Sequence, residues 1–308
     1  MSSRAERRLY AAISYLAWRP EAAPESRQRF FASGPRELRR PGKAFEKRGT
    51  IQRAGELRLI PLEGLPEIRR GANLAALLAH AARERGLAFE RRDILVVAQK
   101  AVSKAEGRVV RLATVRPSPL AREWAERTGQ DARHVEVILR ESRRVLRMTE
   151  RALIVETHHG FVCANAGVDR SNVPTGRGRG GACVTCLPED PDASARAISR
   201  GLQHRTGVAL PVIVSDTFGR PWRLGLVNVA IGAWGLRVLA DLRGTRDVHG
   251  RVLRGTILGV ADELAAAAGL LMGKSEAVPA VIVRGYRYQP GHQRAARMVR
   301  PAAEDLFR

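Results

Sequence analysis

Residues 211–217 read PVIVSDT, an apolar run that ends in a serine, an aspartate and a threonine. Such a run is typical of a strand that is covered on both faces, because a strand of this kind shows no polar alternation. Asp216 then stands where the strand leaves the sheet, and it is held rigidly at the sheet edge. Carboxylate oxygens suit hard cations such as Mg²⁺. Taken alone, this aspartate also fits a turn cap.

The chain around this run mixes strand and helix patterns. Predicted strands cover residues 57–64, 93–102, 152–167, 211–217 and 280–286, and predicted helices cover 73–85, 118–145, 192–206 and the stretch that stops at Gly273. No clean βαβ repeat is present, so we predict a mixed α+β fold rather than a doubly wound sheet. The sequence has no G-x-G-x-x-G after a strand and no G-x-x-x-x-G-K-[ST], so the Rossmann and P-loop motifs are absent.

Composition divides the chain into three parts. Residues 1–52 are rich in Arg, Pro, Ser and Glu, which predicts a basic, poorly ordered N-terminal extension. Residues 53–289 carry the organised pattern, and residues 290–308 read as a basic C-terminal tail. No apolar stretch reaches the roughly 18 residues of a membrane helix, and no cleavage motif follows the charged start. With only three cysteines, we expect a cytoplasmic protein that contacts no membrane.

The chain is strongly basic, with 53 Lys and Arg against 31 Asp and Glu. The formal net charge of +22 indicates affinity for anions such as nucleic acid, anionic membrane or small phosphorylated substrates. An Arg-rich solvated surface explains the same charge. Aromatic residues make up 5% and are scattered, so the basic stripe with interleaved aromatics that nucleic-acid binding calls for is not supported.

Two further clusters carry polar groups beside predicted strands. Residues 165–172, NAGVDRSN, combine Asp169 with two asparagines and a glycine, and small residues let the backbone approach a ligand closely. This cluster suits a metal and a nucleotide together, although an Asx-rich turn is the plain alternative. Lys104 follows the buried strand that starts at residue 93, where it suits a terminal phosphate. Gln99 and Ser103 are hydrogen-bond candidates beside it.

Three other features of the sequence are weaker evidence for a functional site. Leu65, Pro66, Glu67 and Ile68 form a tight turn that contains nothing catalytic, so we expect it to line a pocket only through its backbone. His158–His159 would face opposite sides of a strand, and one metal seldom takes both. Cys183–Cys186 lacks a second pair, so we interpret it as an incidental loop pair rather than a zinc site.

Taken together, seven segments resemble the coenzyme F-420-0 L-glutamate ligase family. In order they are LIPLEGLPEI, DILVVAQKAVSKAEGR, NAGVDRSNVP, LPEDPDASA, VIVSDTFGRPWRLGLVNVAIG, ADELAAAAGLLMG and VPAVIVRG. They cover roughly residues 57 to 287, and their common order is far more specific than any one of them.

The resemblance implies a reaction and a fold. GTP, as co-substrate, would phosphorylate the terminal carboxylate of F-420-0 to an acyl phosphate. The amine of L-glutamate would then attack it, and further glutamates would follow through γ-linkages. The implied fold is a mixed-sheet ligase domain of two intimately associated subdomains, here residues 53–289, that forms a homodimer. Mg²⁺ or Mn²⁺ is implied as cofactor, with a monovalent cation such as K⁺.

The resemblance also implies site residues. Asp169 and Asp216 would hold one divalent ion, Thr217 would reach a second, and Lys104 would complete the catalytic set. Contacts to GTP would come from Leu65, Pro66, Glu67, Ile68, Gln99, Lys100, Lys104 and Asn172. The segment that passes along the phosphates would consist of Met272, Gly273, Lys274, Ser275, Glu276, Ala277, Val278 and Pro279.

One position departs from the family pattern. After Met272-Gly273 the family commonly places Glu or Gln as a ligand of the second ion, whereas this chain has Lys274. An ammonium group cannot ligate a cation. Either Glu276 takes this role through a shifted loop, or one ion is lost and Lys274 contacts phosphate directly.

Two alternative functions remain at this point. The first keeps the acyl-phosphate chemistry but uses a different phosphorylated carboxylic acid as acceptor. The second is a basic nucleic-acid-binding relative whose catalytic site has decayed, and it rests on the net charge and on Lys274. Intact Asp169, Asp216 and Lys104 argue against decay.

Overall fold

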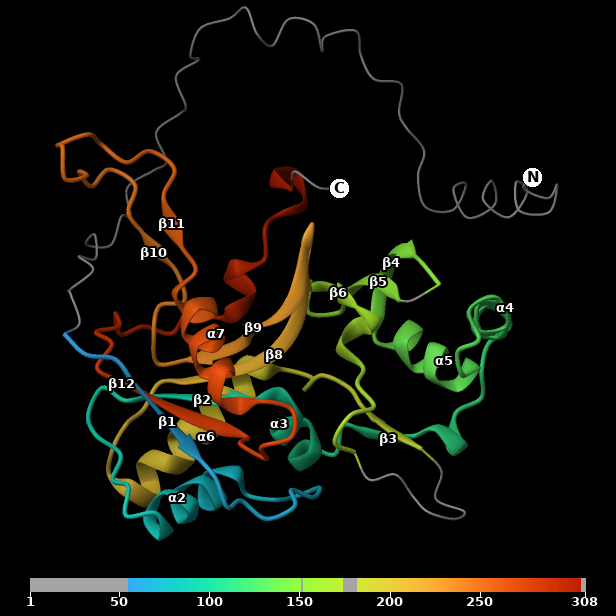
Figure 1. Cartoon of the computed structure of the whole chain (residues 1–308), viewed down its shortest axis with the longest axis horizontal. Coiled ribbons are helices and arrows are strands. Elements are labelled where there is room, and N and C mark those ends of the chain that lie inside the picture. The colour runs from blue at the N-terminus through green and yellow to red at the C-terminus, as the bar shows by residue number, and fades with distance from the viewer. Residues whose placement is uncertain (1–54, 151, 174–181, 306–308) are drawn as a thin grey trace, which may run out of the picture. The chain divides into compact units, whose positions relative to one another are not determined.

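The computed structural model describes residues 55–150, 152–173 and 182–305 (Figure 1). The predicted extension at residues 1–52 lies outside the described residues. Within the described ranges, none of the helices is long and apolar enough to cross a membrane.

A five-stranded mixed sheet forms the centre of the described chain. Its strand order is β1 (Arg58–Leu62), β12 (Ala280–Arg284), β2 (Ile94–Ala98), β8 (Val212–Arg220) and β9 (Arg223–Trp234). β2 and β8 are parallel, whereas every other neighbouring pair is antiparallel. This mixed sheet agrees with the predicted α+β class.

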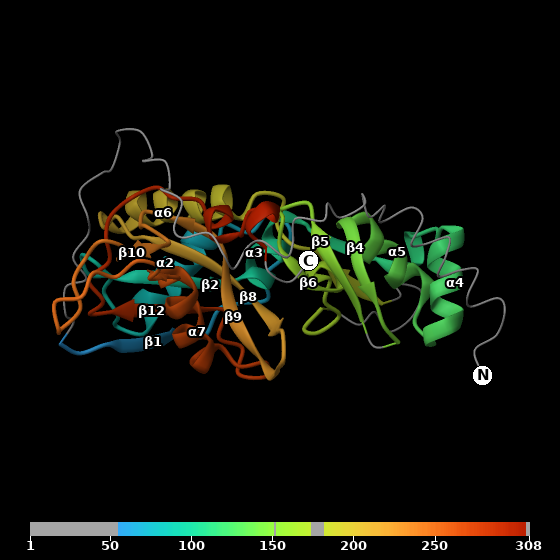
Figure 2. The same cartoon turned by 90° about the horizontal axis from the view of Figure 1, so that it is seen from above.

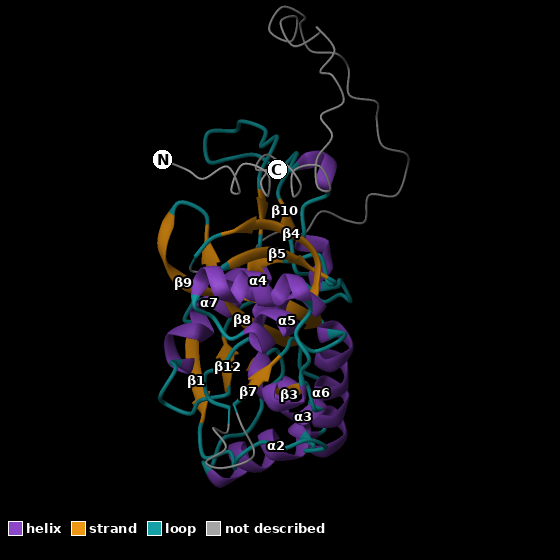
Figure 3. Ribbon diagram, turned by 90° about the vertical axis from the view of Figure 1, so that its right-hand side faces the viewer, coloured by secondary structure: helices purple, strands orange, loops and turns teal. Residues whose placement is uncertain are grey.

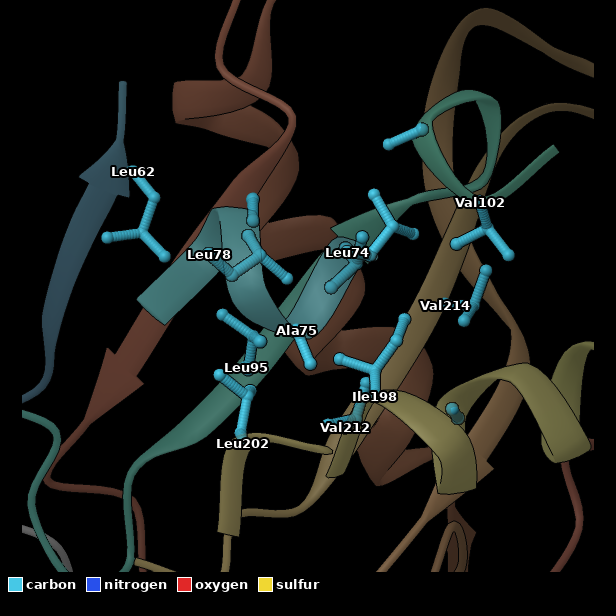
Figure 4. Packing of buried hydrophobic residues seen from close by; sticks show 14 of the residues in the cluster. Leu62, Leu74, Ala75, Leu78, Leu95, Val102, Ile198, Leu202, Val212 and Val214 are labelled. Carbon is cyan, nitrogen blue, oxygen red and sulfur yellow. The ribbon is translucent and has the colours of Figure 1, made fainter. Parts of the chain in front are cut away.

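Helices cover both faces of the sheet, and this is why its strands read as continuous apolar runs. One layer contains α2 (Leu74–Glu84), α3 (Gln99–Glu106) and α6 (Pro191–Thr206), which pack on Leu95 and Val97 of β2. Figure 4 shows this packing, and Figure 3 shows the three helices on the same side of β1 and β12. The other layer is α7 (Val260–Met272), which packs on Ile94 and Val96.

A separate group of elements has its own core. A three-stranded antiparallel sheet orders β4 (Ser142–Met148), β5 (Leu153–Thr157) and β6 (Val162–Ala164), beside α4 (Pro119–Thr128) and α5 (Ala132–Arg140). Figures 1 and 2 both place these five elements together. Smaller elements are β3 (Val109–Arg111) paired with β7 (Cys183–Thr185), β10 (Ala240–Asp241) paired with β11 (Ile257–Leu258), and short 3-10 helices at Leu112–Thr114, Asn165–Gly167, Ala295–Met298 and Ala302–Glu304.

Several predicted elements differ in extent from the structure. The strands expected over residues 152–167 are β5, a turn, β6 and a 3-10 helix, and the strand expected to end at Thr217 continues to Arg220. The strand expected over residues 93–102 ends at Ala98, and α3 begins at Gln99, whose side chain donates to Ser103 one turn later. The helix expected over residues 118–145 is two helices and the start of a strand. It breaks at Gly129, which has a left-handed φ of 68° and ends α4.

Part of the segment expected as a basic tail contacts the domain, because Asp192 in the first turn of α6 binds it. Oδ1 of Asp192 accepts the backbone N–H groups of Ala233 and Ala295, each at 2.8 Å, and its Oδ2 accepts from Nε of Arg294 at 2.9 Å. Ala295 is fully buried. The sequence did not indicate this contact, because Asp192 lies 103 positions before Ala295.

Gly232 on β9 generates a stability prediction. A Cβ atom at this position would overlap the backbone carbonyl of Pro191 at the start of α6. We expect Gly232→Ala to lower the free energy of unfolding by about 1–3 kcal/mol, because backbone must move to admit the methyl group. Urea denaturation measures this change.

Gly255→Ala is the matched control, since a Cβ atom added there would have nothing within 4 Å. Equal stability of the two variants would contradict the close approach of β9 to α6.

Candidate active site

A cavity of about 810 Å³ opens where the parallel pairing of β2 with β8 ends. Ala98 at the end of β2 lies opposite Ser215, so the first turn of α3 begins beside Asp216. The sequence had suggested that Asp216 leaves the sheet, but β8 continues to Arg220, and Asp216 pairs with Val229 of β9. The remaining walls come from the turn after β1, from residues 169–173, from β9, and from α7 with the loop that follows it.

The cavity brings together nearly all of the predicted site residues. Those that line it are Leu65, Pro66, Glu67, Ile68, Gln99, Lys100, Lys104, Asp169, Asn172, Asp216, Thr217, Met272, Gly273, Lys274, Ser275, Ala277, Val278 and Pro279. Glu276 is the exception. These residues span more than 200 positions of the sequence, so their convergence depends on the whole sheet; what each one binds stays a prediction.

Asp216 is a half-buried carboxylate whose protonation depends on its surroundings. Burial, followed by the nearby charge of Asp169, raises the pKa of the Asp216 carboxyl to about 6, although the N–H of Thr217 and the ammonium groups of Lys274 and Lys100 act in the opposite direction. The two aspartates are thus close enough to repel one another. A cation placed between them would relieve this repulsion.

Asp169 is fixed from several sides. Its backbone pairs with Thr185, with N–H···O distances of 3.0 and 2.9 Å. Nζ of Lys100 donates to Oδ2 at 2.8 Å, and the backbone N–H of Ser171 donates to Oδ1 at 2.7 Å. Burial alone raises the pKa of Asp169, but these two donors hold it below its usual value. The carboxylate is therefore ionised and already neighbours one positive charge.

The turn after β1 contributes more than its backbone, which corrects the prediction for residues 65–68. Oε1 of Glu67 accepts from Nζ of Lys104 at 2.7 Å. The Lys104 side chain is only 14% exposed, whereas that of Glu67 is 56% exposed. The glutamate can therefore move into solvent and release the ammonium group to an anionic ligand.

Asn228 lines the cavity and was not predicted from the sequence. It lies opposite Thr217 on β9, and the Thr217 hydroxyl donates to its Oδ1 at 3.0 Å. Its Nδ2 lies 3.5 Å from Sδ of Met272 at the end of α7. The available signal was a lone polar residue in the apolar stretch 227–234. The register between β8 and β9 that places Asn228 opposite Thr217 includes a bulge near Ser215. No pattern in the sequence predicts that bulge.

The loop after α7 has a defined shape. Gly273 ends the helix with a φ of 50°, a left-handed conformation that suits glycine. Nδ2 of Asn172 donates to the carbonyl of Lys274 at 2.9 Å, so residues 102 positions apart fix one another. Glu276 is exposed, and its carboxylate accepts from the backbone N–H and the hydroxyl of Ser275, each at 3.0 Å.

Lysine is rare in this chain and is concentrated at the cavity. The sequence contains five lysines among its 53 basic residues. Lys43 and Lys47 lie outside the described residues. The other three, Lys100, Lys104 and Lys274, all line the cavity. Where this chain needs a surface cation it uses arginine, so these ammonium groups mark a local requirement for a compact charge.

The histidine and cysteine pairs lie elsewhere. His158 and His159 occupy a turn between β5 and β6 rather than the strand we expected, and their Nε2 atoms lie 2.9 and 2.8 Å from backbone carbonyls. Cys183 belongs to β7 rather than to a loop, and Cys186 is buried. Burial, with the nearby charge of Glu141, raises the pKa of the Cys186 thiol to about 12, which disfavours its thiolate form.

The chemistry of the cavity fits a divalent ion with an anionic ligand. Asp169 and Asp216 offer hard oxygen donors, and their mutual repulsion is of the kind that a cation relieves. Lys104 and Lys274 provide positive charge for phosphate groups, and the side chains of Leu65, Leu270 and others give an apolar wall for a ring. The volume suits a nucleotide-sized ligand.

Metal binding tests this arrangement directly. We expect Asp216→Asn to weaken Mn²⁺ binding by at least about tenfold, because it removes one of two charged oxygen ligands at a site of low solvent access. Isothermal titration calorimetry of the full chain measures the affinity. Glu126→Gln, an exposed substitution on α4, serves as the control; equal affinities in the two variants would remove Asp216 from the site.

Comparison with known proteins identifies the family. The family model described as F420-0:Gamma-glutamyl ligase matches residues 64–285. The chain is 48% identical over 255 residues to the coenzyme F420:L-glutamate ligase of Methanothermobacter thermautotrophicus, a match that covers 81% of this chain and 98% of the relative. It is 46% identical over 257 residues to the ligase of that name from Methanopyrus kandleri, with 82% and 98% covered. The corresponding protein of Methanocaldococcus jannaschii is 40% identical over 261 residues, with 84% and 99% covered. The chain therefore belongs to the F420-0:gamma-glutamyl ligase family.

Proposed function

We propose that this chain is a GTP-dependent ligase that joins L-glutamate to coenzyme F-420-0. The observation that carries the proposal is the convergence of Asp169 and Asp216 with Lys100, Lys104 and Lys274 on one cavity. The names of the relatives, each a coenzyme F420:L-glutamate ligase, support the acceptor and the amino acid. The two-part ligase architecture of residues 53–289 is part of the same proposal.

The proposed reaction has two balanced steps. The terminal carboxylate of F-420-0 attacks the γ-phosphorus of GTP, the bond to the bridging oxygen breaks, and GDP leaves as an acyl phosphate forms. The amine of L-glutamate then attacks the acyl carbon, loses a proton, and expels inorganic phosphate as the amide bond forms. Further glutamates are added through γ-linkages by the same chemistry.

The residues of the chain have to neutralise and align charge, because phosphoryl transfer needs little covalent help from a protein. Lys104 leaves Glu67 and contacts the phosphates, and the loop from Gly273 to Pro279 passes along them. Asp169 and Asp216 are the residues that would hold Mg²⁺ or Mn²⁺. The ion, when bound, withdraws charge from the phosphate oxygens and fixes their orientation.

The Asp216 carboxyl contributes through its protonation state. A metal ligand must be ionised, and burial raises the pKa of this carboxyl to about 6. The carboxylate is therefore mostly ionised at neutral pH, and a bound cation would stabilise the ionised form further. Lys100 stays beside Asp169 and limits the net negative charge that an incoming phosphate meets.

The assembly and location are further parts of the proposal. We expect a homodimer in the cytoplasm, and a monovalent cation such as K⁺ as an additional ion. Support for an interface comes from the hairpin that joins β8 and β9, where Trp222, Leu224 and Leu226 are 80%, 98% and 62% exposed. Exposed apolar clusters of this kind mark protein contacts.

The dimer is tested by light scattering of the full chain. We expect twice the mass of one chain, and we expect Leu224→Asp to shift the protein toward the single-chain mass, because a charge at a buried contact is costly. A single-chain mass for the unsubstituted protein would contradict the dimer.

The ligation itself is tested by incubating the protein with GTP, L-glutamate, Mg²⁺ and F-420-0. We expect the acceptor to gain the mass of one glutamyl unit, measured by mass spectrometry, because the acyl phosphate is trapped by the glutamate amine. Asp216→Asn is expected to make no product while it keeps the circular dichroism spectrum and melting temperature of the parent.

Other outcomes favour the alternatives. Steady GTP hydrolysis with no mass gain indicates that a different carboxylic acid is the acceptor. Salt-sensitive retention on DNA together with no metal-dependent GTP binding indicates the nucleic-acid-binding alternative.

A further inference from the structure

Four of the six charged side chains that line the cavity form two ion pairs with one another, and the other two do not. Lys100 pairs with Asp169 at 2.8 Å, and Lys104 pairs with Glu67 at 2.7 Å. Asp216 and Lys274 are the other charged lining residues. Neither of them forms an ion pair within 4.0 Å with any residue of the described chain. Among the three ammonium groups that line the cavity, that of Lys274 is therefore the one without a carboxylate partner in the described part of the chain.

Lys274 lines the same cavity as the two carboxylates that the proposed function assigns to the metal, Asp169 and Asp216. The backbone of Lys274 is fixed by the hydrogen bond from Asn172 and by the left-handed turn at Gly273. The side chain therefore starts from a defined point at the rim of the cavity, and the residue is exposed there.

The described residues supply ligands for one divalent ion but not for two. Three carboxylates line the cavity. Asp169 and Asp216 are assigned to one ion in the proposed function, and Glu67 belongs to the turn after β1, where it pairs with Lys104. No group of three or more His, Cys, Asp or Glu side chains within the described chain is arranged to hold a metal ion. Glu276 is the acid nearest to Lys274 in the sequence. Its carboxylate instead binds the backbone and hydroxyl of Ser275, outside the cavity lining.

The choice of lysine at position 274 is informative because the chain avoids lysine. Its basic residues are almost all arginine, and each lysine of the described chain lines this cavity. A guanidinium is planar and binds through a broad fork, whereas an ammonium is a compact point charge with three donors, which can contact several phosphate oxygens.

We propose that Lys274 supplies, to the terminal phosphates of the nucleotide, the positive charge that a second metal ion would otherwise supply, so that this chain binds one divalent ion per nucleotide. The proposal rests on the GTP-dependent function proposed above. It assigns Lys274 a direct contact with the nucleotide and leaves Glu276 with a role in the shape of the loop.

Counting bound Mn²⁺ tests the proposal without any turnover. The full chain is placed in excess over a non-hydrolysable GTP analogue, and bound Mn²⁺ is counted by electron paramagnetic resonance. We expect one Mn²⁺ per bound nucleotide for the parent protein. Lys274→Glu replaces the ammonium with a carboxylate and is expected to bind two.

Glu276→Gln is the matched control, since it removes a charge from the same loop. It is expected to leave the count at one. Two ions in the parent protein, or the loss of an ion in Glu276→Gln, would show that Glu276 or another group completes a second metal site and would overturn the proposal.

Nucleotide affinity provides a second readout. Titration calorimetry with the same analogue and Mn²⁺ is expected to show at least about tenfold weaker binding for Lys274→Gln, the loss expected for one charge-assisted contact, and partial recovery for Lys274→Arg. Unchanged affinity in Lys274→Gln overturns the contact. If the parent protein binds no GTP analogue, the proposed function fails as well; tight binding with two ions refutes the role of Lys274 alone.

Discussion

The parallel pairing of β2 with β8 is the constraint on which the site depends. It is the one parallel contact in an otherwise antiparallel sheet. Because the two strands run in the same direction, the first turn of α3 begins beside Asp216, at the point where β8 continues past the end of β2. Side chains alternate between faces along a strand, so a shift of one residue would turn Asp216 to the opposite layer. The apolar side chains of β2 and β8, buried in two different cores, therefore also determine where the charges stand.

The charges of the cavity balance in the absence of a ligand, with three ammonium groups and three carboxylates among its lining residues. A cation alone has to compete with Lys100 for Asp169, and an anion alone has to compete with Glu67 for Lys104. A cation and a phosphate that arrive as a complex meet both requirements at once. The same balance explains how two acidic side chains can share a partly buried site without losing their charge near neutral pH.

The mixed α+β class and most of the residues that line the cavity could be predicted from the sequence, for different reasons. Runs such as residues 211–217 are apolar on both faces, and this pattern is visible locally. Asp216 and Asp169 were candidate site residues because they follow such runs. The loop after α7 became a candidate only through the resemblance to the family. Three features of the site could not be predicted from the sequence. The start of α3 at Gln99, the pairing of Glu67 with Lys104, and the contact of Thr217 with Asn228 all depend on a register or an approach between distant segments. The tie between Asp192 and the segment at Ala295 was hidden for the same reason.

The position of β12 has a consequence for how the chain is made. Among the described strands, β12 comes last in the sequence, yet it lies between β1 and β2, which come first. While the nascent chain is still on the ribosome, β1 lacks its partner in this sheet and one edge of β2 stays open. Unpaired edges of apolar strands invite association with other chains. The edges of β1 and β2 therefore stay open to such association until β12 has been synthesised. A nonsense mutation as late as residue 280 removes a central strand of the sheet rather than a peripheral one.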